Sequence, residues 1–365
     1  MANKNDDLRR ILLVRNDRIG DLVLTMPAFE AVRRHWPQAH LTALVSPYAA
    51  PLLAGARSLD ELLVVDRKEK ARALAARLKA MRFDAAVLFS TNTRNCLAVW
   101  LARIPQRVCW AYKPIGFLTG NRRVAVRRSH PPIHESDFAL AFVRRLGGSA
   151  DMGDFLPKLE VDAATHERVA TRIEQDLGSR GPLFGVHPGN NHSAYNWPPS
   201  HYAQLVARLA QHGRVMVTGN PIERTLLDWI RGQLPQNVRN RVAFYSDFQL
   251  LELAAALAQQ TALTVSSTGP MHIAGVLGTP VVALFSPHPA HVPAKWRPLG
   301  ENHTILVAPY LKGEDPRVPP RRGTAVMSRI RIEQVLDANL HYVQRGTSGR
   351  TAADSLSKHR PEQAA

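Results

Sequence analysis

The chain has 365 residues, more than a single hydrophobic core usually holds, so its length predicts two domains. Its 47 Lys and Arg against 30 Asp and Glu give a net charge of +17, which favours a polyanionic partner, although a basic surface can also serve solubility alone. The two cysteines are too few for a disulfide framework or a cysteine-type zinc site, and no uncharged apolar stretch approaches the roughly 20 residues of a membrane span.

Short apolar runs alternate with amphipathic runs through the first half of the chain. Such alternation is typical of a parallel sheet that is covered by helices. From the N-terminus, the expected elements are a strand at 11–15, a helix at 22–34, strands at 41–45 and 62–65, a helix at 69–81, a strand at 85–90 and a helix at 135–146.

A composition break at 149–159, rich in Gly, Asp and Pro, predicts an interdomain linker. We therefore expect an N-terminal domain at 1–155, a C-terminal domain at 156–345 and a disordered tail at 346–365. A last helix at about 330–345 could pack back on the N-terminal domain. Before it, the second domain should contain helices at 163–177, 201–211, 222–234 and 250–257, and strands at 183–186, 215–218, 242–245, 262–265 and 281–286.

The basic charge is concentrated in the stretch 85–134, which has no acidic residue. Such a field would attract an anionic membrane surface or a phosphorylated glycolipid, so we expect a cytoplasmic protein that rests on the inner face of the cytoplasmic membrane. Nucleic acid is less favoured, because the basic residues are not interleaved with aromatic ones in a recognisable binding module. The eight basic residues of the stretch are Arg94, Arg103, Arg107, Lys113, Arg122, Arg123, Arg127 and Arg128.

The run Ser266–Gly275 lies between two apolar strands of the second half. This order predicts a turn at the carboxyl end of a parallel strand, followed by a helix whose first N–H groups and partial positive charge suit an anion. Small residues would let a phosphate approach the backbone, and His272 could add a donor. An ordinary strand-to-helix turn with a helix-facing histidine explains the same residues.

Two further loops follow strands of the second half, where open α/β sheets bind ligands. His187–Asn191 combines a glycine with amide side chains, and Gly219–Glu223 places Glu223 in the first turn of a helix. With the turn at Ser266, these loops could bind phosphate groups, and Glu223 could accept from a ribose diol. An acidic first turn also suits the helix dipole without any ligand.

In the first half, Gly20 permits a tight turn after the strand at 11–15, and Asp21 stands at or just before the next helix. As an N-cap, Asp21 would be structural. As a carboxylate beside a bound acceptor, it could remove a proton from a hydroxyl. The two roles can coexist.

Other chemistries have little support in the sequence. The chain lacks a Walker P-loop, a GxGxxG fingerprint after the first strand and a G-x-S-x-G elbow. His288 and His291 stand three apart in a proline-rich loop without a clear partner cluster, so no metal site is predicted.

Four groups of short motifs occur here in a specific order: Arg15–Ala28; His187–Gly189 with Trp197-Pro198; Thr218–Glu223; and Thr268–Ala274 with Gly278–Val281. In these motifs the chain resembles the family 9 glycosyltransferases, the ADP-heptose:lipopolysaccharide heptosyltransferases. The resemblance runs from about Ile11 to Gln344.

The resemblance implies an α/β protein of the GT-B type, with two Rossmann-like doubly wound domains that face a central cleft. The first domain would bind the acceptor and the second the nucleotide-sugar donor. The reaction implied is an inverting, metal-independent transfer of heptose from ADP-heptose to the inner core of lipopolysaccharide, on an anionic acceptor of the lipid A–Kdo type and without a cofactor.

The same resemblance implies the site residues. Asp21 would be the general base. The donor would contact His187, Gly189, Asn190, Thr218, Glu223, Phe248, Ser267, Thr268, Gly269 and His272. Acceptor or phosphate contacts are expected from Arg15, Arg18, Arg122 and Arg123.

Two positions depart from the family pattern. Many members carry Asp where this chain has Ser267, and Lys or Arg where it has Asn196. The first change leaves open the transfer of another sugar into a different surface glycan, and the second leaves open how the leaving phosphate is neutralised. A non-catalytic protein that binds nucleotide sugars or polyanions is a further alternative.

Overall fold

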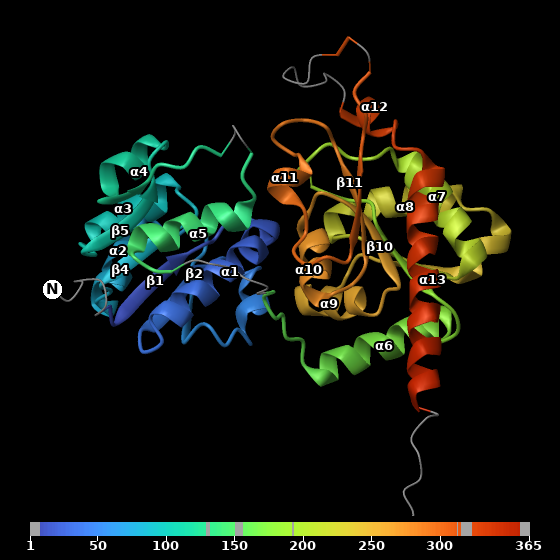
Figure 1. Ribbon diagram of the computed structural model, residues 1–365, viewed down its shortest axis with the longest axis horizontal. Coiled ribbons are helices and arrows are strands. Elements are labelled where there is room, and N and C mark those ends of the chain that lie inside the picture. The colour runs from blue at the N-terminus through green and yellow to red at the C-terminus, as the bar shows by residue number, and fades with distance from the viewer. Residues whose placement is uncertain are drawn as a thin grey trace, which may run out of the picture. The chain divides into compact units, whose positions relative to one another are not determined.

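The computed structural model describes residues 8–128, 132–149, 156–191, 193–311, 313–314 and 323–357. The chain divides into two compact units, and Figure 1 labels many of their elements. The first unit comprises Met1–Asp162 and the later segment Val292–Gly300, and the second comprises Ala163–His291 and Glu301–Ala365. The sequence had suggested a single boundary after residue 155 and gave no sign that a segment of the second half joins the first unit.

The first unit is built on six parallel strands in the order β3-β2-β1-β4-β5-β6. The strands are β1 (Arg10–Val14), β2 (His40–Val45), β3 (Glu61–Val64), β4 (Ala85–Leu88), β5 (Gln106–Trp110) and β6 (Arg122–Val124). Around them lie α1 (Ile19–His35), η1 (Ala50–Leu53), α2 (Ala71–Met81), α3 (Thr93–Leu101), α4 (Pro114–Thr119), α5 (Glu135–Leu146) and α11 (Pro293–Trp296).

The second unit repeats this topology, with six parallel strands in the order β12-β11-β10-β7-β8-β9. The strands are β7 (Leu183–His187), β8 (Arg214–Thr218), β9 (Val242–Tyr245), β10 (Ala262–Ser266), β11 (Val281–Phe285) and β12 (His303–Val307). The helices are α6 (Ala163–Leu177), α7 (Pro199–His212), η2 (Pro221–Glu223), α8 (Arg224–Gln233), η3 (Gln236–Arg241), α9 (Leu250–Ala258), α10 (Gly269–Leu277), α12 (Gly323–Met327) and α13 (Ile332–Ser357).

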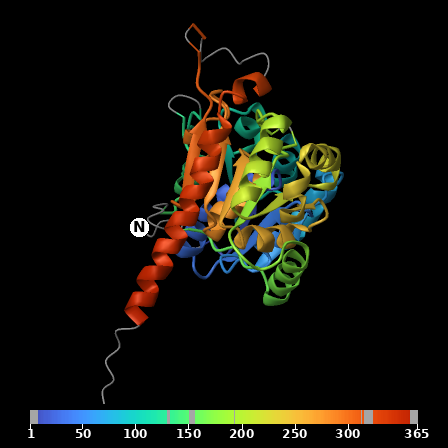
Figure 2. The ribbon, with the colours of Figure 1, turned by 90° about the vertical axis from the view of Figure 1, so that its right-hand side faces the viewer.

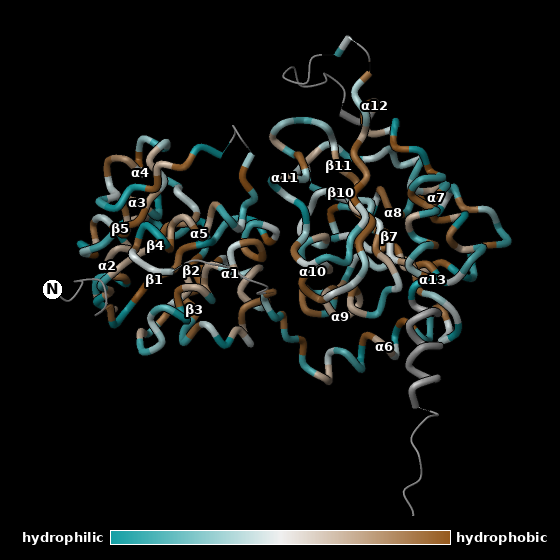
Figure 3. The backbone as a smooth tube through the Cα atoms, viewed as in Figure 1, coloured by the Kyte–Doolittle hydropathy of each residue, from teal (hydrophilic) through white to brown (hydrophobic). Residues whose placement is uncertain are grey.

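Apolar strands buried on both faces form the centre of each unit. Figure 3 shows β1, β10 and β11 in the hydrophobic colour, and the side chains of Ile11–Val14 and Val281–Phe285 are fully buried. Continuous apolar runs of this kind are expected where helices cover both faces of a parallel sheet. The predicted strands and helices are therefore present, with ends shifted by one to three residues for most of them.

Four elements of the first unit, α3, β5, α4 and β6, lie in the stretch 91–134, for which the sequence predicted none. They are short, and β5 begins with the polar pair Gln106-Arg107, so neither length nor periodicity marks them.

Glycine fixes the end of the next helix: Gly147, with φ 114°, closes α5 and donates to the carbonyls of Val143 and Arg144.

The last helix, α13, packs within the second unit on α7 and the strands β10 and β11, as Figure 2 shows. Trp197 Nε1 donates to the Ile330 carbonyl (3.0 Å), and the buried Asn339 amide donates to Thr264 Oγ1 (2.8 Å). Packing of this helix on the N-terminal domain, which the sequence allowed, stays a prediction. Helical backbone also continues to Ser357, beyond the predicted start of the tail at 346, and residues 358–365 lie outside the described part.

Within the described residues, no helix combines the length and the apolar character that crossing a bilayer requires.

Candidate functional site

In each unit, the strand order reverses direction between two central strands, β1 and β4 in the first and β7 and β10 in the second. Loops that leave the carboxyl ends of such a pair diverge and leave a crevice, which is where doubly wound sheets bind ligands. Most of the predicted site residues follow β1, β7, β8 or β10.

Arg15 is the centre of a buried charge cluster in the first unit. Its guanidinium, 3% exposed, donates from Nη2 to Asp21 Oδ1 (2.6 Å) and to Glu135 Oε1 (3.0 Å), and from Nη1 to the Phe89 carbonyl (3.0 Å). Its Nε lies 3.0 Å from Asp17 Oδ1. Burial disfavours the charged guanidinium, but the three carboxylates outweigh this and raise the pKa of Arg15.

Asp21 is the third residue of α1, not its N-cap. Arg18 occupies the N-cap position, and no side-chain hydrogen bond caps the helix. The capping role that the sequence allowed for Asp21 is therefore wrong, because its carboxylate accepts from Arg15 instead. Burial is the largest cause that raises the pKa of Asp21 to about 6; the Arg15 guanidinium opposes the shift, and Asp17 and Glu135 add to it.

Glu135 is a site residue that the sequence did not suggest. It is the first residue of α5, 3% exposed, and its second carboxylate oxygen pairs with Arg128. A signal was present in hindsight: Glu135 is the first acidic residue after the acid-free stretch 85–134. A buried carboxylate needs cationic partners, and Arg15 and Arg128 supply them.

Other contacts fix the loop after β1. The amide of Asn95 in α3 donates to Asn16 Oδ1 (2.8 Å), while Asn92 caps α3 by accepting from the Asn95 N–H (2.9 Å). The Tyr48 hydroxyl donates to the Asp17 carbonyl, and burial raises the pKa of that hydroxyl. The loop between β1 and the helix that carries Asp21 is thus held by α3 on Asn16 and by Tyr48 on Asp17.

The remaining predicted acceptor contacts are dispersed. Arg18 is exposed at the start of α1. Arg122 and Arg123 lie on the edge strand β6, three strands from β1 and hence about 14 Å away across the sheet. Arg122 reaches the carbonyls of Arg145 and Leu146 (both 3.4 Å), and Arg123 donates to the Phe117 carbonyl (3.0 Å).

In the second unit, His187 and Thr218 end the adjacent strands β7 and β8 and are hydrogen-bonded to each other, with Nδ1 and Oγ1 2.8 Å apart. His187 Nε2 lies 4.0 Å from Glu223 Oε2. Burial lowers the pKa of His187, so its ring is neutral at pH 7 and can act as a hydrogen-bond partner but not as a fixed cation.

Glu223 takes part in a capping box. Its Oε2 accepts from the Asn220 N–H (3.0 Å), and the Asn220 side chain accepts from the Glu223 N–H (3.2 Å). Its Oε1 accepts from the Asn191 N–H (3.3 Å). The structural role that the sequence allowed is therefore present. Each carboxylate oxygen still has a lone pair to offer a ligand.

Gly189 lies directly against this carboxylate. A Cβ on Gly189 would come within 2.0 Å of Glu223 Cδ, so any larger residue would push the carboxylate away from its present position. Both residues belong to the predicted donor site, and the structure shows that they are neighbours.

Asn196 joins the loops after β7 and β10. Its Oδ1 accepts from Ser266 Oγ (2.6 Å), Tyr202 Oη (3.0 Å) and the Trp197 N–H (2.9 Å), and its Nδ2 donates to the Pro188 carbonyl (2.6 Å). Where the family pattern has a cation, this chain therefore has a neutral amide that makes four hydrogen bonds. Nearby, Asn190 Nδ2 donates to the Ala194 carbonyl (2.8 Å).

The predicted phosphate turn lies at the start of α10. Thr268 is the N-cap residue, and its hydroxyl makes no capping bond. Pro270 lacks an N–H, and the Met271 N–H bonds to the Thr268 carbonyl (3.1 Å), so the helix end offers the Gly269 N–H, a hydroxyl and the helix dipole.

The flanking residues of this turn are fixed in different ways. The Ser267 carbonyl accepts from Ser193 Oγ (3.1 Å), which ties the turn to the loop after β7. His272 is buried one turn into α10.

Phe248 follows β9 and stacks on Tyr245, with ring centres 4.8 Å apart and planes 20° apart. The Arg172 guanidinium lies 5.1 Å from the Phe248 ring centre and pairs with both Asp247 oxygens (3.0 and 3.1 Å). Because Tyr245 covers one face of Phe248, a nucleobase could stack only on the other.

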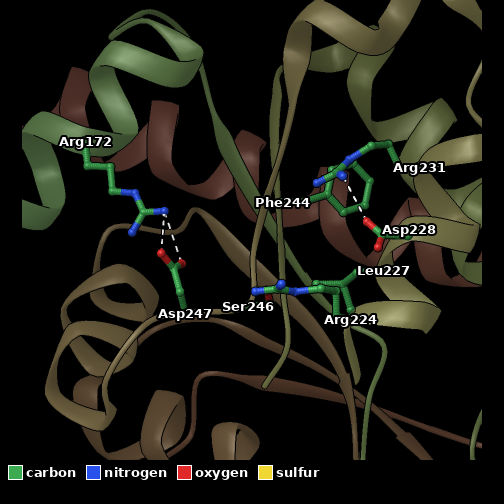
Figure 4. A pocket seen from close by; sticks show the side chains of 8 residues that line it. All are labelled: Arg172, Arg224, Leu227, Asp228, Arg231, Phe244, Ser246 and Asp247. Atoms are coloured by element: carbon green, nitrogen blue, oxygen red, sulfur yellow. Dashed lines mark hydrogen bonds and ion pairs between the residues drawn. The ribbon is translucent and has the colours of Figure 1, made fainter. Parts of the chain in front are cut away.

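An open pocket of about 410 Å³ lies beside this group, between α6, α8 and the end of β9 (Figure 4). Two of its arginines are matched by acids: Arg172 by Asp247 and Arg231 by Asp228 (2.9 Å). Arg224 points into the pocket beside Ser246 and has no acidic partner within 4.0 Å among the described residues. Arg224 is thus the arginine of this pocket that a ligand anion could pair with.

No cluster of three or more His, Cys, Asp or Glu side chains suited to a metal ion occurs in the described ranges. His288 and His291 instead pack their rings on each other, with centres 5.1 Å apart, and against Tyr195.

The chain is similar to proteins of a known family. The model of glycosyltransferase family 9 (heptosyltransferase) matches residues 71–318. A Haemophilus influenzae protein named as a glycosyltransferase is 28% identical over 307 residues, which cover 80% of this chain and 87% of that protein. Lipopolysaccharide heptosyltransferase 2 of Escherichia coli is 25% identical over 291 residues, covering 76% of this chain and 83% of that enzyme.

Among solved structures, the E. coli ADP-heptose lps heptosyltransferase II is similar with a TM-score of 0.76 at 20% identity, and the likeness covers 93% of this chain and 99% of that one. This likeness, with the two doubly wound sheets, confirms the predicted α/β fold class of the GT-B type. The family match spans more than half of the chain, so the protein belongs to glycosyltransferase family 9 and is a glycosyltransferase.

Proposed function

We propose that the protein is an inverting, metal-independent heptosyltransferase, which moves heptose from ADP-heptose to the inner core of lipopolysaccharide, with Asp21 as its general base. The observation that carries the proposal is the Arg15–Asp21 pair at the carboxyl end of β1, in a chain that belongs to a family of heptosyltransferases. The relatives' names supply the sugar and the glycan.

A carboxylate with a pKa of about 6 suits a general base at neutral pH, because it is ionised there yet more basic than an ordinary Asp. In the proposed step, the acceptor hydroxyl gives its proton to the Asp21 carboxylate while its oxygen attacks the anomeric carbon. The bond from that carbon to the diphosphate breaks, and ADP leaves with the electron pair. Attack opposite the leaving group inverts the anomeric centre.

Arg15 holds Asp21 in place for this step. Its Nη2 bonds only Oδ1 of Asp21, so Oδ2 remains available to the acceptor hydroxyl. The same guanidinium would stabilise the negative charge before the proton arrives. Glu135 and the Phe89 carbonyl fix the guanidinium and thereby the carboxylate.

The donor would bind to the loops of the second unit. Glu223 would accept from the ribose diol, and the turn at Thr268 and Gly269 would bind the diphosphate through an N–H, a hydroxyl and the dipole of α10. His187 is neutral and can donate from its ring to a phosphate oxygen. The Phe248 face that is free of Tyr245 is the expected place for adenine.

The acceptor would be an anionic glycolipid of the lipid A–Kdo type, and the protein would work as a peripheral protein on the inner face of the cytoplasmic membrane. The acid-free, basic stretch of the first unit supports an anionic acceptor there.

The deciding experiment is transfer by the purified protein from ADP-heptose to defined core-truncated acceptors, read as a mass increase of one heptose. We expect transfer with inversion, and equal rates with and without a chelator. Absence of transfer to every truncated acceptor would refute the function, and loss of activity with the chelator would refute its metal independence.

A second candidate is the transfer of another sugar into a different surface glycan, which Ser267 favours because it replaces the family's sugar-contacting Asp. Competition between ADP-heptose and a panel of ADP-, UDP- and GDP-sugars separates the two. Salt-sensitive binding of polyanions without any donor hydrolysis or transfer would instead support a non-catalytic role.

A further inference from the structure

Exposed apolar side chains gather around α4 in the first unit. Of the twelve large apolar side chains that are exposed in the described part of the chain, five fall between residues 100 and 118. Leu118 is 75% exposed and Phe117 51%, both on α4, and Tyr112 is exposed just before it. Trp100 and Leu101 are exposed at the end of α3, the helix that packs on α4.

Cations surround these apolar groups. The Arg123 guanidinium lies 4.1 Å from the Phe117 ring centre, and the Arg127 guanidinium 5.8 Å from that of Tyr112. Lys113 is exposed at the N-cap of α4. We call Tyr112, Lys113, Phe117, Leu118, Arg123 and Arg127 the α4 surface.

The position of the α4 surface is fixed by the fold, because α4 packs very closely on β5. A Cβ on Gly116 would lie 2.5 Å from the Trp110 carbonyl oxygen, and one on Gly120 would lie 2.7 Å from Cys109 Cβ. Only glycine at both positions permits this approach. Phe117 and Leu118 are therefore held outward by a short helix seated directly on the sheet.

The α4 surface and Asp21 both lie beyond the carboxyl ends of the strands of the first unit. β5 runs parallel to β1, two strands away, and α4 follows its carboxyl end. A series of contacts joins the two: the Tyr112 and Trp110 ring centres are 6.1 Å apart, Arg128 lies over Trp110, and Arg128 pairs with Glu135 of the charge cluster.

We propose that the α4 surface docks the protein on an anionic lipid bilayer, with Phe117 and Leu118 entering the interface and Lys113, Arg123 and Arg127 contacting lipid phosphates. Aromatic and aliphatic tips surrounded by Lys and Arg suit the boundary between headgroups and acyl chains. The proposed function adds that a lipid-borne acceptor would then arrive at the edge of the sheet where Asp21 stands.

Charge favours a bilayer over a protein partner. The whole stretch 85–134 lacks an acidic residue, so a partner must supply negative charge over a broad area. An anionic leaflet does so at every point, and it attracts each Lys or Arg near its surface. A second copy of this chain would bring the same positive charge to the contact and be repelled.

The test is flotation of the full-length protein, without substrates, with vesicles of phosphatidylcholine alone or mixed with phosphatidylglycerol. We expect flotation with the mixed vesicles only and its loss at high salt. Leu118→Asp and Lys113→Glu should each lower partitioning by about tenfold, because each removes a favourable contact and adds a repulsive charge.

Two matched variants control for the loss of any exposed apolar or basic side chain. Leu311→Asp changes another exposed leucine, in the second unit, and Lys158→Glu changes another exposed lysine of the first unit. Both should float like the unchanged protein. Thermal unfolding of all four variants checks that each is folded.

Three results would overturn the assignment: no flotation with mixed vesicles, equal flotation with phosphatidylcholine alone, or equal losses in the control pair. Self-association that Leu118→Asp abolishes, without vesicle binding, would make the surface a dimer contact and also overturn it. Failure of the proposed function is distinguishable, because it would appear as absent transfer to a delipidated acceptor while flotation persists.

Discussion

The two units share one topology but carry opposite chemistry at the same topological position. After β1, the first unit buries a guanidinium among the carboxylates of Asp17, Asp21 and Glu135. After β7 and β10, the second unit places a neutral His187, the Asn196 junction and a helix N-terminus. Glu223 adds a carboxylate to this site, and backbone N–H groups bond both of its oxygens.

This difference shows how one strand order can serve two substrates. A cluster of opposite charges shifts the pKa of a carboxyl and so prepares it for proton transfer. N–H and hydroxyl donors can bind a diphosphate, and the carboxylate described among them, that of Glu223, is already bonded by backbone N–H groups. Four substitutions test this division, from the largest expected effect to the smallest.

Asp21→Asn should lower kcat by about a thousandfold, because an amide cannot take the proton of the acceptor hydroxyl. Donor binding and thermal stability should change little. The matched control is Asp17→Asn, which alters another carboxylate beside Arg15 and should keep kcat within a few-fold at pH 8. If Asp21→Asn kept full turnover, the charge cluster would be only structural.

Asn196→Lys should destabilise the second unit by about 3 kcal/mol, because an ammonium cannot accept the hydrogen bonds of the buried Ser266 and Tyr202 hydroxyls. The variant restores the cation of the family pattern, so tighter donor binding is the competing expectation. Chemical denaturation measures the loss, and Asn302→Lys, which breaks one surface hydrogen bond, is the control. An unchanged unfolding midpoint for Asn196→Lys would show that the junction is dispensable.

Gly189→Ala should raise the donor KM by about tenfold with a smaller change in kcat. The added Cβ must displace the Glu223 carboxylate, which then presents its oxygens in a different place. Steady-state kinetics with varied donor measures this. The control is Gly232→Ala in α8, where a Cβ meets nothing within 4 Å and the helix should gain about 0.5–1 kcal/mol. An unaltered KM would show that the donor does not use Glu223.

The smallest effect concerns pH. Since Asp21 must be ionised to act as a base, kcat/KM should rise with pH through about 6. The charge of Asp17 raises the pKa of Asp21, so Asp17→Asn should move this limb to lower pH, whereas Asp137→Asn on α5 should not. If the acid limb of the pH profile stayed at the same pH in Asp17→Asn, the charge cluster would not control the pKa of the general base.

Stability should respond in the opposite direction. The folded state binds the Asp21 proton more tightly than the unfolded state does, so this residue favours folding at low pH and loses that contribution as pH rises from about 4 to 6. In Asp21→Asn, this component of the pH dependence should vanish from denaturation curves.

Local patterns in the sequence were sufficient for the fold class and for most elements. Alternation of apolar and amphipathic runs predicted both parallel sheets, and each motif-bearing loop follows a strand as expected. The short elements between 91 and 134 could not be predicted, because α4 has six residues and β6 three. Their position depends on close packing at Gly116 and Gly120, which periodicity does not report.

The site was predictable as a set of residues but not as a set of contacts. Arg15 was expected to meet an anionic ligand, yet it is engaged by Glu135, which stands 120 positions further along the chain. At Asn196, the sequence showed only that the family's cation is absent. The structure shows that this side chain accepts from three donors, two of which are the hydroxyls of Tyr202 and Ser266. No local pattern suggests the roles of those two residues. The donor and base assignments themselves stay predictions until the variants are measured.

The short segment Val292–Gly300 bears on how the protein is made. It belongs to the first unit, where the buried His134 Nε2 contacts the Arg297 carbonyl (3.0 Å) and Arg128 lies over Trp296. On the ribosome, the first 162 residues emerge long before residue 300 does. The N-terminal half therefore cannot complete its contacts with this segment until most of the second unit has been translated. Until then, His134 lacks this acceptor.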